Sequence, residues 1–323
     1  MAKSPAEKLS LKRHALIERT ALALDVSTTE SERLLTINRQ QSVRLNPLKG
    51  NPQATLAELQ SAGWQGEQVA WAPHCYTIAN QPEIVRDSLA ATEGRAFIQN
   101  AASWLPVLAL DPQAGESILD VCAAPGGKTS HIAAITNNQA AITANDNSRP
   151  RLAKMRANFD RLGVTSAETT LFDATQIARK LDGTLFDKIL LDAPCSGEGM
   201  MQLTRDKDFA TWSVAHIKRL QQLQKKILLQ AWHLLKPGGT LVYSTCTIAP
   251  EENEAVVDYL LRTQPGAQIA PFTIDLPNRI KPVLVWNGKA FDPRLKDAVR
   301  LVPHPRIEAF FVCVLTKSLT VDD

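Results

Sequence analysis

The spacing of hydrophobic residues changes along the chain and divides its 323 residues into three segments. Residues 1–40 repeat Leu, Ile and Ala at intervals typical of an amphipathic helix, so they predict a helical N-terminal segment. Residues 41–92 combine strand-like alternation in SVRLN (42–46) with the helix-like LAELQSAG (56–63), which predicts a small α/β domain. We expect the third segment, 93–318, to form one larger domain.

Apolar runs alternate with helix-like stretches throughout residues 93–318. AFIQNAASWLPVLAL (96–110) predicts an amphipathic helix, and residues 212–239 predict a long helix that ends at Gly238-Gly239. Strands separated by helices indicate an α/β fold, with a parallel, doubly wound sheet and helices on both faces. The expected strands are ESILDVCA (116–123), AAITAND (140–146), AETTLFDA (167–174), DKILLDAP (187–194), GTLVYSTC (239–246) and EAFFVCVLT (308–316).

A loop with two glycines, LDVCAAPGGKTSH (119–131), includes the end of the first of these strands. Its Gly127-Lys128-Thr129 is similar to the end of a P-loop, but that motif requires glycine where this chain has Cys122. Pro125 also lacks the N–H group that a phosphate-binding turn uses. The dinucleotide fingerprint GxGxxG is absent as well. The sequence therefore favours neither a triphosphate nor a pyrophosphate as the ligand of this loop.

Acidic residues at the ends of the next two strands indicate a ligand of another kind. Asp146 ends the second strand, nineteen residues after Gly127, where an acid can bind a ribose diol. Asp173 ends the third strand, beside the expected position of an adenine ring. A nucleoside without phosphates fits this combination, and S-adenosylmethionine is the common one. The alternative is a structural turn with two surface acids.

Two of the five cysteines, Cys195 and Cys246, also lie at strand ends. Buried cysteines usually fill cores, and we interpret Cys75 and Cys313 in that way. A thiol beside a methyl donor indicates methylation of a pyrimidine at C5, because a thiolate that adds to C6 makes C5 nucleophilic. Asp192 is placed to stabilise the charge that this addition creates. The residues alone do not decide which cysteine is the nucleophile.

Composition narrows the class of protein. The cysteine count is odd and no CxxC pair occurs, so we expect neither a disulfide framework nor a metal site. No apolar signal region begins the chain and no apolar run reaches membrane-spanning length, which favours a cytoplasmic protein. Residues 1–50 hold nine Lys or Arg against five Asp or Glu, a net charge of +4, whereas the whole chain carries +3. A basic segment suits a polyanionic partner, and a solvated helical face is the alternative.

The ordered set of motifs resembles that of the Sun/Fmu (Nol1/Nop2/Sun) family of RNA (cytosine-5) methyltransferases. The similarity extends from about Arg44 to Leu315 and so covers most of the chain. The resemblance implies a class I, Rossmann-like methyltransferase domain in 93–318, with a seven-stranded, mostly parallel sheet, and an RNA-recognition-like domain in 41–92. The motifs that carry it are RLNPLKG, FIQNAASWLP, LDVCAAPGGKTS, AND, FDA, LLDAPCSGEGM and YSTCTIAPEENE.

The resemblance also implies roles for site residues. Cys246 would be the nucleophile and Cys195 would assist product release, while Asp192 and Lys128 would lie beside the target base. The cofactor would be S-adenosylmethionine. Its binding site would consist of Cys122, Ala123, Ala124, Pro125, Gly126, Gly127, Lys128, Asp146, Arg151, Asp173 and Asp192.

The implied partner is RNA, with ribosomal RNA favoured over transfer RNA, and we expect a monomer. In the last strand, Glu308 is followed by Ala309 where the family usually has glycine, so we expect a local shift of the turn with the chemistry retained. One alternative is a catalytically inactive RNA-binding or ribosome-assembly factor on the same fold. Another is a methyltransferase that acts on DNA or protein.

Overall fold

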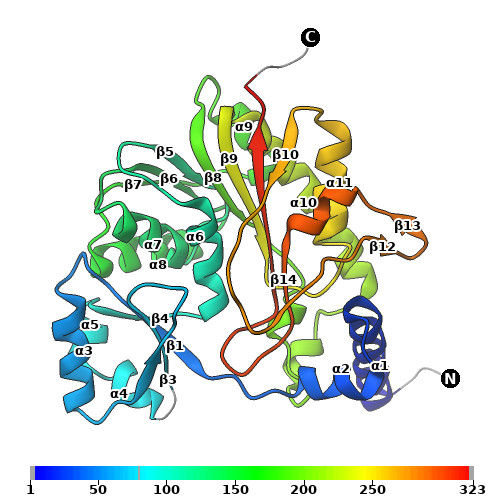
Figure 1. Ribbon diagram of the computed structural model, residues 1–323, viewed down its shortest axis with the longest axis horizontal. Helices are drawn as coiled ribbons and strands as arrows, with labels where there is room; N and C mark the ends of the chain where they lie inside the picture. Colours follow the sequence, from blue (N-terminus) through cyan, green and yellow to red (C-terminus); the bar gives the residue numbers. More distant parts are fainter. Residues whose placement is uncertain (1–3, 79–80, 320–323) are drawn as a thin grey trace.

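The computed structural model describes residues 4–78 and 81–319 and arranges them in three sheets with surrounding helices (Figure 1). Residues 1–3 of the expected N-terminal segment lie outside the described residues. The helices are α1 (Pro5–Leu24), α2 (Thr28–Leu35), α3 (Pro52–Ser61), α4 (Pro82–Arg86), α5 (Leu89–Thr92), α6 (Leu105–Leu110), α7 (Gly127–Ile135), α8 (Arg149–Leu162), α9 (Ile177–Lys180), α10 (Val214–His233) and α11 (Glu254–Thr263). The strands are β1 (Gln41–Leu45), β2 (Gly66–Gln68), β3 (Cys75–Ile78), β4 (Ala96–Ile98), β5 (Ser117–Asp120), β6 (Ala141–Asn145), β7 (Ala167–Thr170), β8 (Phe186–Asp192), β9 (Leu235–Thr245), β10 (Ala267–Ala270), β11 (Arg279–Ile280), β12 (Val285–Trp286), β13 (Lys289–Ala290), β14 (Val299–Leu301) and β15 (Phe310–Lys317).

The large sheet has the order β11-β14-β15-β9-β8-β5-β6-β7, and β10 also pairs with β15. Strands β7, β6, β5, β8 and β9 run parallel, whereas β15 is antiparallel to β9. The chain begins this sheet at β5 and builds outward in both directions, so the order reverses between β5 and β8. Loops that follow the strands on either side of such a reversal open a crevice in which ligands bind.

Helices cover both faces of the large sheet, as its apolar strands require. On one face α6 and α7 pack over Ile118, Leu190 and Val242, with α8 beside them. On the other face α10 and α11 pack over Leu191 and Tyr243, among the residues of the largest buried cluster. The two layers lie on opposite sides of the strands in Figure 1. No helix in residues 4–78 or 81–319 is long and apolar enough to cross a lipid bilayer.

The small sheet, of order β2-β3-β1-β4, packs one face on α3 and α4 and the other on the rest of the protein. Val43 and Leu45 of β1 point to the helices, while Arg44 between them is buried on the opposite face. The Arg44 guanidinium donates a hydrogen bond to Ser130 Oγ of α7 at 2.9 Å and lies 5.8 Å from the centre of the Phe97 ring. Contact with α7 therefore covers this region of the sheet.

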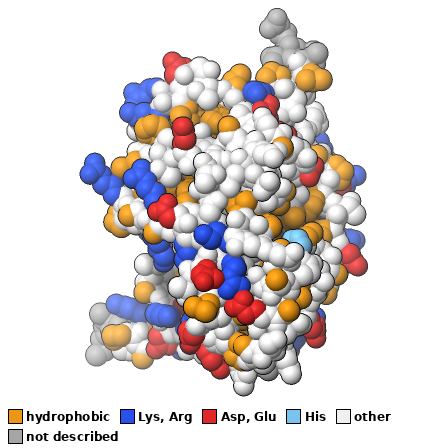
Figure 2. Space-filling view, turned by 90° about the vertical axis from the view of Figure 1, so that its left-hand side faces the viewer, with side chains coloured by type: hydrophobic (Ala, Val, Ile, Leu, Met, Phe, Trp, Pro, Cys, Tyr) orange, Lys and Arg blue, Asp and Glu red, His pale blue; other side chains and the backbone are white. Residues whose placement is uncertain are grey.

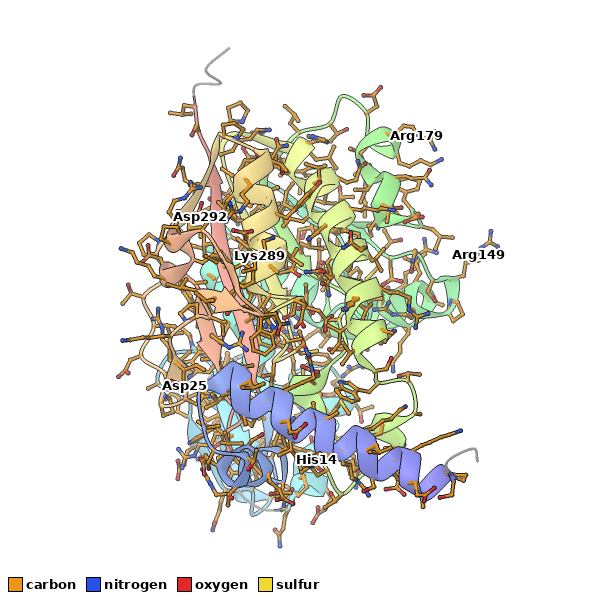
Figure 3. The ribbon with its side chains drawn as sticks, turned by 90° about the vertical axis from the view of Figure 1, so that its right-hand side faces the viewer. His14, Asp25, Arg149, Arg179, Lys289 and Asp292 are labelled. Atoms are coloured by element: carbon orange, nitrogen blue, oxygen red, sulfur yellow. The ribbon has the colours of Figure 1, made fainter. Side chains whose placement is uncertain are left out.

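Helices α1 and α2 pack beside the segments that follow β8 and β9. Leu16 and Leu35 share a buried cluster with Met201, Phe209 and Ile248. Figure 3 shows α1 lying below α10 and α11, with His14 near its middle and Asp25 just after its last residue. The N-terminal helices thus support loops at the carboxyl ends of two neighbouring strands.

The expected single helix at 96–110 is wrong. Residues 96–98 form β4, which pairs with β1, residues 101–104 form a 3₁₀ turn, and α6 begins only at Leu105. Pro106 explains this start, since proline has no N–H and fits only the first turn of a helix. Strand β4 also lies beyond residue 92, so the small sheet extends past the boundary expected from the sequence.

Candidate active site

A cavity of about 310 Å³ opens at the carboxyl ends of β5, β6, β8 and β9, where the order of the sheet reverses. Parallel strands deliver their following residues to the same edge of the sheet, and this edge collects most of the residues expected at the site. Of the residues expected from the sequence, those that line the cavity are Cys122, Ala124, Asp146, Arg151, Asp173, Asp192, Cys195 and Cys246.

The loop between β5 and α7 forms one wall, and its N–H groups are largely used within the protein. The N–H of Val121 donates to Leu190 O, that of Ala123 to Asn145 O, and that of Gly126 to Ala123 O. Gly126 itself has φ 95° and turns toward α8, where a β-carbon would lie 2.8 Å from the Phe159 ring. Three of the five N–H groups between residues 121 and 126 are therefore unavailable to a phosphate.

Asp146 follows β6 and is almost completely buried. Its Oδ1 accepts a hydrogen bond from the Ser148 N–H at 3.0 Å, and its Oδ2 lies 3.3 Å from Arg151 Nη1. Arg151 also donates to Ala124 O at 2.6 Å, so it links the acid to the loop after β5. The preceding Asn145 donates to Val121 O and Phe172 O, which joins three strand ends. The Asp146 carboxylate is thus held in place at the cavity wall.

The far end of the cavity combines a carboxylate with apolar side chains. Asp173 follows β7, is exposed, and accepts hydrogen bonds from the N–H and hydroxyl of Thr175. Leu223 and Ile227 of α10 lie along the same cavity. Their apolar surface beside an acid suits a flat heterocycle that carries an amino group. The sequence shows both residues on the apolar stripe of a long helix but does not indicate that they face a ligand.

Asp192, the last residue of β8, lies between two hydrogen-bond donors. Lys128 Nζ contacts its Oδ2 at 2.7 Å, and the Ser244 hydroxyl donates to its Oδ1 at 2.9 Å. Burial acts to lower the pKa of Lys128, but the neighbouring Asp192 carboxylate raises it overall, so the ammonium remains charged. Charged hydrogen bonds of this length are strong and fix the carboxylate of Asp192.

The sulfur atoms of Cys195 and Cys246 lie 3.4 Å apart at the end of the cavity nearest to Asp192. The hydrogen bond with Cys246, together with burial, raises the pKa of Cys195 well above its usual range. Cys195 therefore keeps its proton near neutral pH and can donate it to the other sulfur. Burial also raises the pKa of Cys75 to about 12 and raises the pKa values of Cys122 and Cys313. These three thiols are therefore poor nucleophiles.

A second cavity, also of about 310 Å³, adjoins the first and shares Cys122, Ala124 and Asp192 with it. Its walls include Lys128 and the loop residues Gln99 and Asn100, which follow β4. The sequence did not identify these two amides because it predicted a helix there. Of the expected cofactor residues, Ala123, Pro125 and Gly127 line this cavity, and Gly126 lines neither.

Backbone contacts hold the Cys246 loop close to the last strand. The N–H of Gly199 donates to Cys246 O at 2.9 Å, and a β-carbon on Gly199 would lie 2.4 Å from Ala309 O. Ala309 is fully buried and is not among the described residues with positive φ, so its own β-carbon is accommodated without strain. Glycine is needed at 199, where three backbone segments meet.

The basic N-terminal segment is attached to the body of the protein by several of its own cations. Lys12 Nζ donates to Phe209 O at 2.6 Å, and Arg13 pairs with Asp206 at 2.5 Å. The Arg19 guanidinium contacts both oxygens of Glu251 at 3.0 Å. A polyanion would have to compete with these internal pairs for the same cations. The positive charge of residues 1–50 therefore indicates a polyanionic partner less strongly than the sequence alone suggested.

The residues present suit S-adenosylmethionine. A buried, fixed carboxylate at Asp146 can accept the hydrogen bonds of a ribose diol, and the apolar wall from Leu223 to Ile227 can hold an adenine ring. The occupied N–H groups of Val121, Ala123 and Gly126 agree with a ligand that lacks phosphate. Within the described part of the chain, no group of three or more His, Cys, Asp or Glu is arranged to bind a metal ion.

Comparison with known proteins places these features in context. Residues 107–316 match the family described as 16S rRNA methyltransferase RsmB/F. A tRNA (cytosine(49)-C(5))-methyltransferase from Pyrococcus abyssi is 37% identical over 284 residues, which cover 85% of this chain and 88% of that protein. The ribosomal RNA small subunit methyltransferase F of Aeromonas hydrophila is 42% identical over 228 residues, covering 69% of this chain and 48% of that protein. This chain therefore matches only about half the length of the second relative.

A crystal structure of a methyltransferase homologue from Pyrococcus horikoshii has the same fold. It superimposes with a TM-score of 0.77 at 31% sequence identity, and the match covers 94% of this chain and 99% of the homologue's chain. The expected Rossmann-like methyltransferase fold is thereby confirmed. The seven strands β7, β6, β5, β8, β9, β15 and β10 form its sheet, which β14 and β11 extend on the side of β15.

Proposed function

The chain belongs to the 16S rRNA methyltransferase RsmB/F family, and from this premise we propose that it transfers a methyl group from S-adenosylmethionine to C5 of a cytosine in RNA. The observation that supports this reaction most directly is the pair of sulfurs, 3.4 Å apart, beside Asp192 and Lys128. Methylation of an amino group or a hydroxyl needs no thiol, whereas methylation at C5 requires a nucleophile that activates the ring.

Cys246 gives its proton to solvent and begins the reaction as a thiolate, whose sulfur adds to C6 of the cytosine. A bond forms between Sγ and C6, and the electrons of the C5–C6 double bond make C5 nucleophilic. Bound S-adenosylmethionine would supply an electrophilic methyl group to C5, with S-adenosylhomocysteine as the leaving group. Cys195 keeps its proton because its pKa is raised, so it stabilises the neighbouring sulfur through a hydrogen bond without competing as a nucleophile.

Asp192 and Lys128 stabilise the ring while Cys246 is attached. Addition at C6 places negative charge on the far side of the pyrimidine, at N3 and the exocyclic oxygen. Lys128 is a charged donor for that side, and the Asp192 carboxyl group is an acceptor for the exocyclic amino group of cytosine. Their mutual contact at 2.7 Å orients both groups before the base arrives.

Cys195 acts in the second half of the cycle. After methyl transfer, a solvent water can take the C5 proton, the electrons of that C–H bond restore the C5–C6 double bond, and the bond between C6 and Cys246 breaks with its electrons on sulfur. The Cys195 sulfur contacts the Cys246 sulfur and is thus the protein group best placed to return a proton to the departing thiolate. Loss of Cys195 would leave the RNA attached to Cys246.

RNA is the proposed substrate class, with ribosomal RNA as the first candidate because the matching family is described by 16S rRNA. The relative that this chain covers to 88% is a transfer RNA enzyme, so transfer RNA is the second candidate. The cytosine must leave its stack to reach Cys246, which costs least in loops and bulges. Figure 2 shows several groups of Lys and Arg side chains on one face, some beside Asp and Glu.

The proposal is tested by incubating the protein with labelled S-adenosylmethionine and separate fractions of ribosomal and transfer RNA, followed by digestion to nucleosides. We expect label in 5-methylcytidine alone. Label confined to other nucleosides would contradict the reaction. Cofactor binding without any transfer would instead support a non-catalytic assembly factor, which the presence of Cys246, Cys195, Asp192 and Lys128 at one site disfavours.

A further inference from the structure

A buried polar network joins the two loops that carry the cysteines. Ser196 directly follows Cys195, Thr247 directly follows Cys246, and their hydroxyl oxygens lie 2.8 Å apart. Glu252, which is completely buried, contacts both loops. Its Oε2 accepts the Ser196 N–H at 2.9 Å, and its Oε1 accepts the Ser196 hydroxyl. The Thr247 hydroxyl lies 3.4 Å from the same Oε1 and is linked to it through Ser196. One carboxyl group thus connects residues adjacent to both sulfurs.

Glu252 is itself held from two directions. Gln224 of α10 donates through the same Nε2 to Glu252 Oε2 at 2.8 Å and to Pro194 O at 2.9 Å. The Tyr243 hydroxyl of β9 donates to the carbonyl of Glu252 at 2.6 Å. Side chain and backbone of Glu252 are therefore fixed relative to α10 and to the strand that leads to Cys246.

The segment around Cys195 has no regular secondary structure of its own. Strand β8 ends at Asp192, and the next helical turn begins only at Glu198. Between these points Cys195 has the Cys246 sulfur as its only side-chain hydrogen-bond partner among the described residues. The position of Cys195 therefore depends on the contacts that its neighbours Pro194 and Ser196 make with Gln224, Thr247 and Glu252.

We propose that Glu252 is a positioning residue for Cys195. It holds the turn at Cys195 and Ser196 against the loop of Cys246, and so sets the contact between the two sulfurs on which release of the methylated RNA depends. The role of Glu252 in release of the RNA rests on the proposed function, whereas its positioning of Cys195 does not depend on that function. Glu252 does not line either cavity, so it acts through Ser196 and not on the substrate.

The carboxyl group suits this task because its two oxygens accept three hydrogen bonds. Ser196 supplies two of the donors and Gln224 supplies the third. The Thr247 hydroxyl lies closer to Ser196 Oγ and to Glu198 than to Glu252, so it joins the network through them. A glutamine at 252 has the same size but only one acceptor oxygen, so either the Ser196 hydroxyl must turn its proton away or the Ser196 N–H and the Gln224 amide lose their acceptor. An aspartate keeps both acceptor oxygens on a shorter side chain and is expected to retain part of the network.

The first test uses the protein without RNA, so it does not depend on the proposed function. Diamide oxidises two adjacent thiols to a disulfide, and the rate at which it links Cys195 to Cys246 reports how well the sulfurs are aligned. We expect Glu252→Gln to slow this rate by about tenfold and Glu252→Asp by less, because disulfide formation requires specific geometry. The matched control is Glu251→Gln, which removes the neighbouring acid of the same segment; the hydrogen bonds of Glu251 are with Arg19 and not with Ser196 or Thr247.

The second test follows the covalent protein–RNA adduct on denaturing gels. Glu252→Gln should accumulate adduct as Cys195→Ala does, with unchanged affinity for S-adenosylmethionine, while Glu251→Gln should turn over normally. A folded Glu252→Gln protein that is oxidised at the normal rate would overturn the proposal. If Glu252→Gln does not fold, the same criterion applies to Glu252→Asp. If Glu252→Gln slows disulfide formation but the wild-type protein never methylates RNA, the positioning of Cys195 is supported and the proposed function is contradicted.

Discussion

The sulfur atoms of Cys195 and Cys246 lie 3.4 Å apart although the residues are separated by 51 positions in the sequence. Strands β8 and β9 are parallel neighbours in which Asp192 pairs with Ser244, so each cysteine follows its strand at the same edge. The parallel register thus places a sulfur that keeps its proton beside the sulfur proposed to attack the base.

Mild oxidation should inactivate the protein reversibly. At 3.4 Å the two sulfurs need only a small movement to reach the bond length of a disulfide, about 2.05 Å. We expect diamide to abolish methyl transfer and dithiothreitol to restore it. Peptide mass mapping under non-reducing conditions should show Cys195 joined to Cys246, with Cys75 and Cys313 still reduced in the core. A disulfide that involves Cys122 instead would contradict the geometry.

Replacement of Lys128 by methionine should impair chemistry more than binding. The Lys128→Met variant loses the charged donor at 2.7 Å from Asp192, and removal of one such group from a reacting centre costs about 10²-fold in kcat. Affinity for S-adenosylmethionine, measured by calorimetry, should change much less. Lys188→Met is the matched control, since Lys188 is also partly buried and paired, with Glu116, but lies at the opposite end of β8. Equal losses in both variants would show that Lys128 has only a structural role.

Asp146→Asn should weaken cofactor binding. The buried carboxylate of Asp146 is the proposed acceptor for two ribose hydroxyls, and loss of charged hydrogen bonds of this kind weakens binding by about 10- to 100-fold. Calorimetry with S-adenosylmethionine measures the change directly. Asp160→Asn, on the exposed side of α8, should bind normally. Unchanged binding by Asp146→Asn would place the ribose elsewhere.

Two buried carboxyl groups predict a stability that falls as pH rises. Burial raises the pKa of Asp120 to about 7, and burial together with the charge of Glu198 raises the pKa of Glu252 to about 7. The folded protein binds these protons more tightly than the unfolded chain, in which carboxyl pKa values are about 4. The resulting stabilisation is complete below the unfolded values and is lost as pH rises through about 7. The Tm should therefore fall more from pH 5 to pH 8 in the wild type than in Glu252→Gln, and equal slopes would contradict this.

The sequence predicted the site best for residues that lie at the ends of apolar strands. The ends of the runs at 140–146, 187–194 and 239–246 correctly placed Asp146, Asp192 and Cys246 at one edge of the sheet. Parallel strands separated by helices leave little choice about where their carboxyl ends meet, so the local pattern was sufficient. The proposed role of the loop at 121–126 followed from the residue types themselves, because Cys122 and Pro125 disfavour a phosphate-binding turn.

Features that depend on tertiary partners were not predictable in this way. Phe97 and Ile98 have a helix-like pattern but become β4 because β1 offers hydrogen bonds, and this carries Gln99 and Asn100 to the second cavity. Glu252 occurs in a motif quoted for the resemblance, yet its contact with Ser196 exists only because α10 and two strand ends converge there. Strands β10 and β14 pair with β15, β11 pairs with β14, and β12 pairs only with β13; these short strands have no pattern of their own.

The central claim, a covalent bond between Cys246 and the target cytosine, is tested most directly by mass spectrometry of the trapped adduct. The Cys195→Ala protein is incubated with S-adenosylmethionine and RNA, denatured, and digested with nuclease and protease. The account predicts a peptide that contains Cys246 bound through sulfur to a methylated cytidine. An adduct carried by Cys195 in the Cys246→Ala protein, with none in Cys195→Ala, would contradict it.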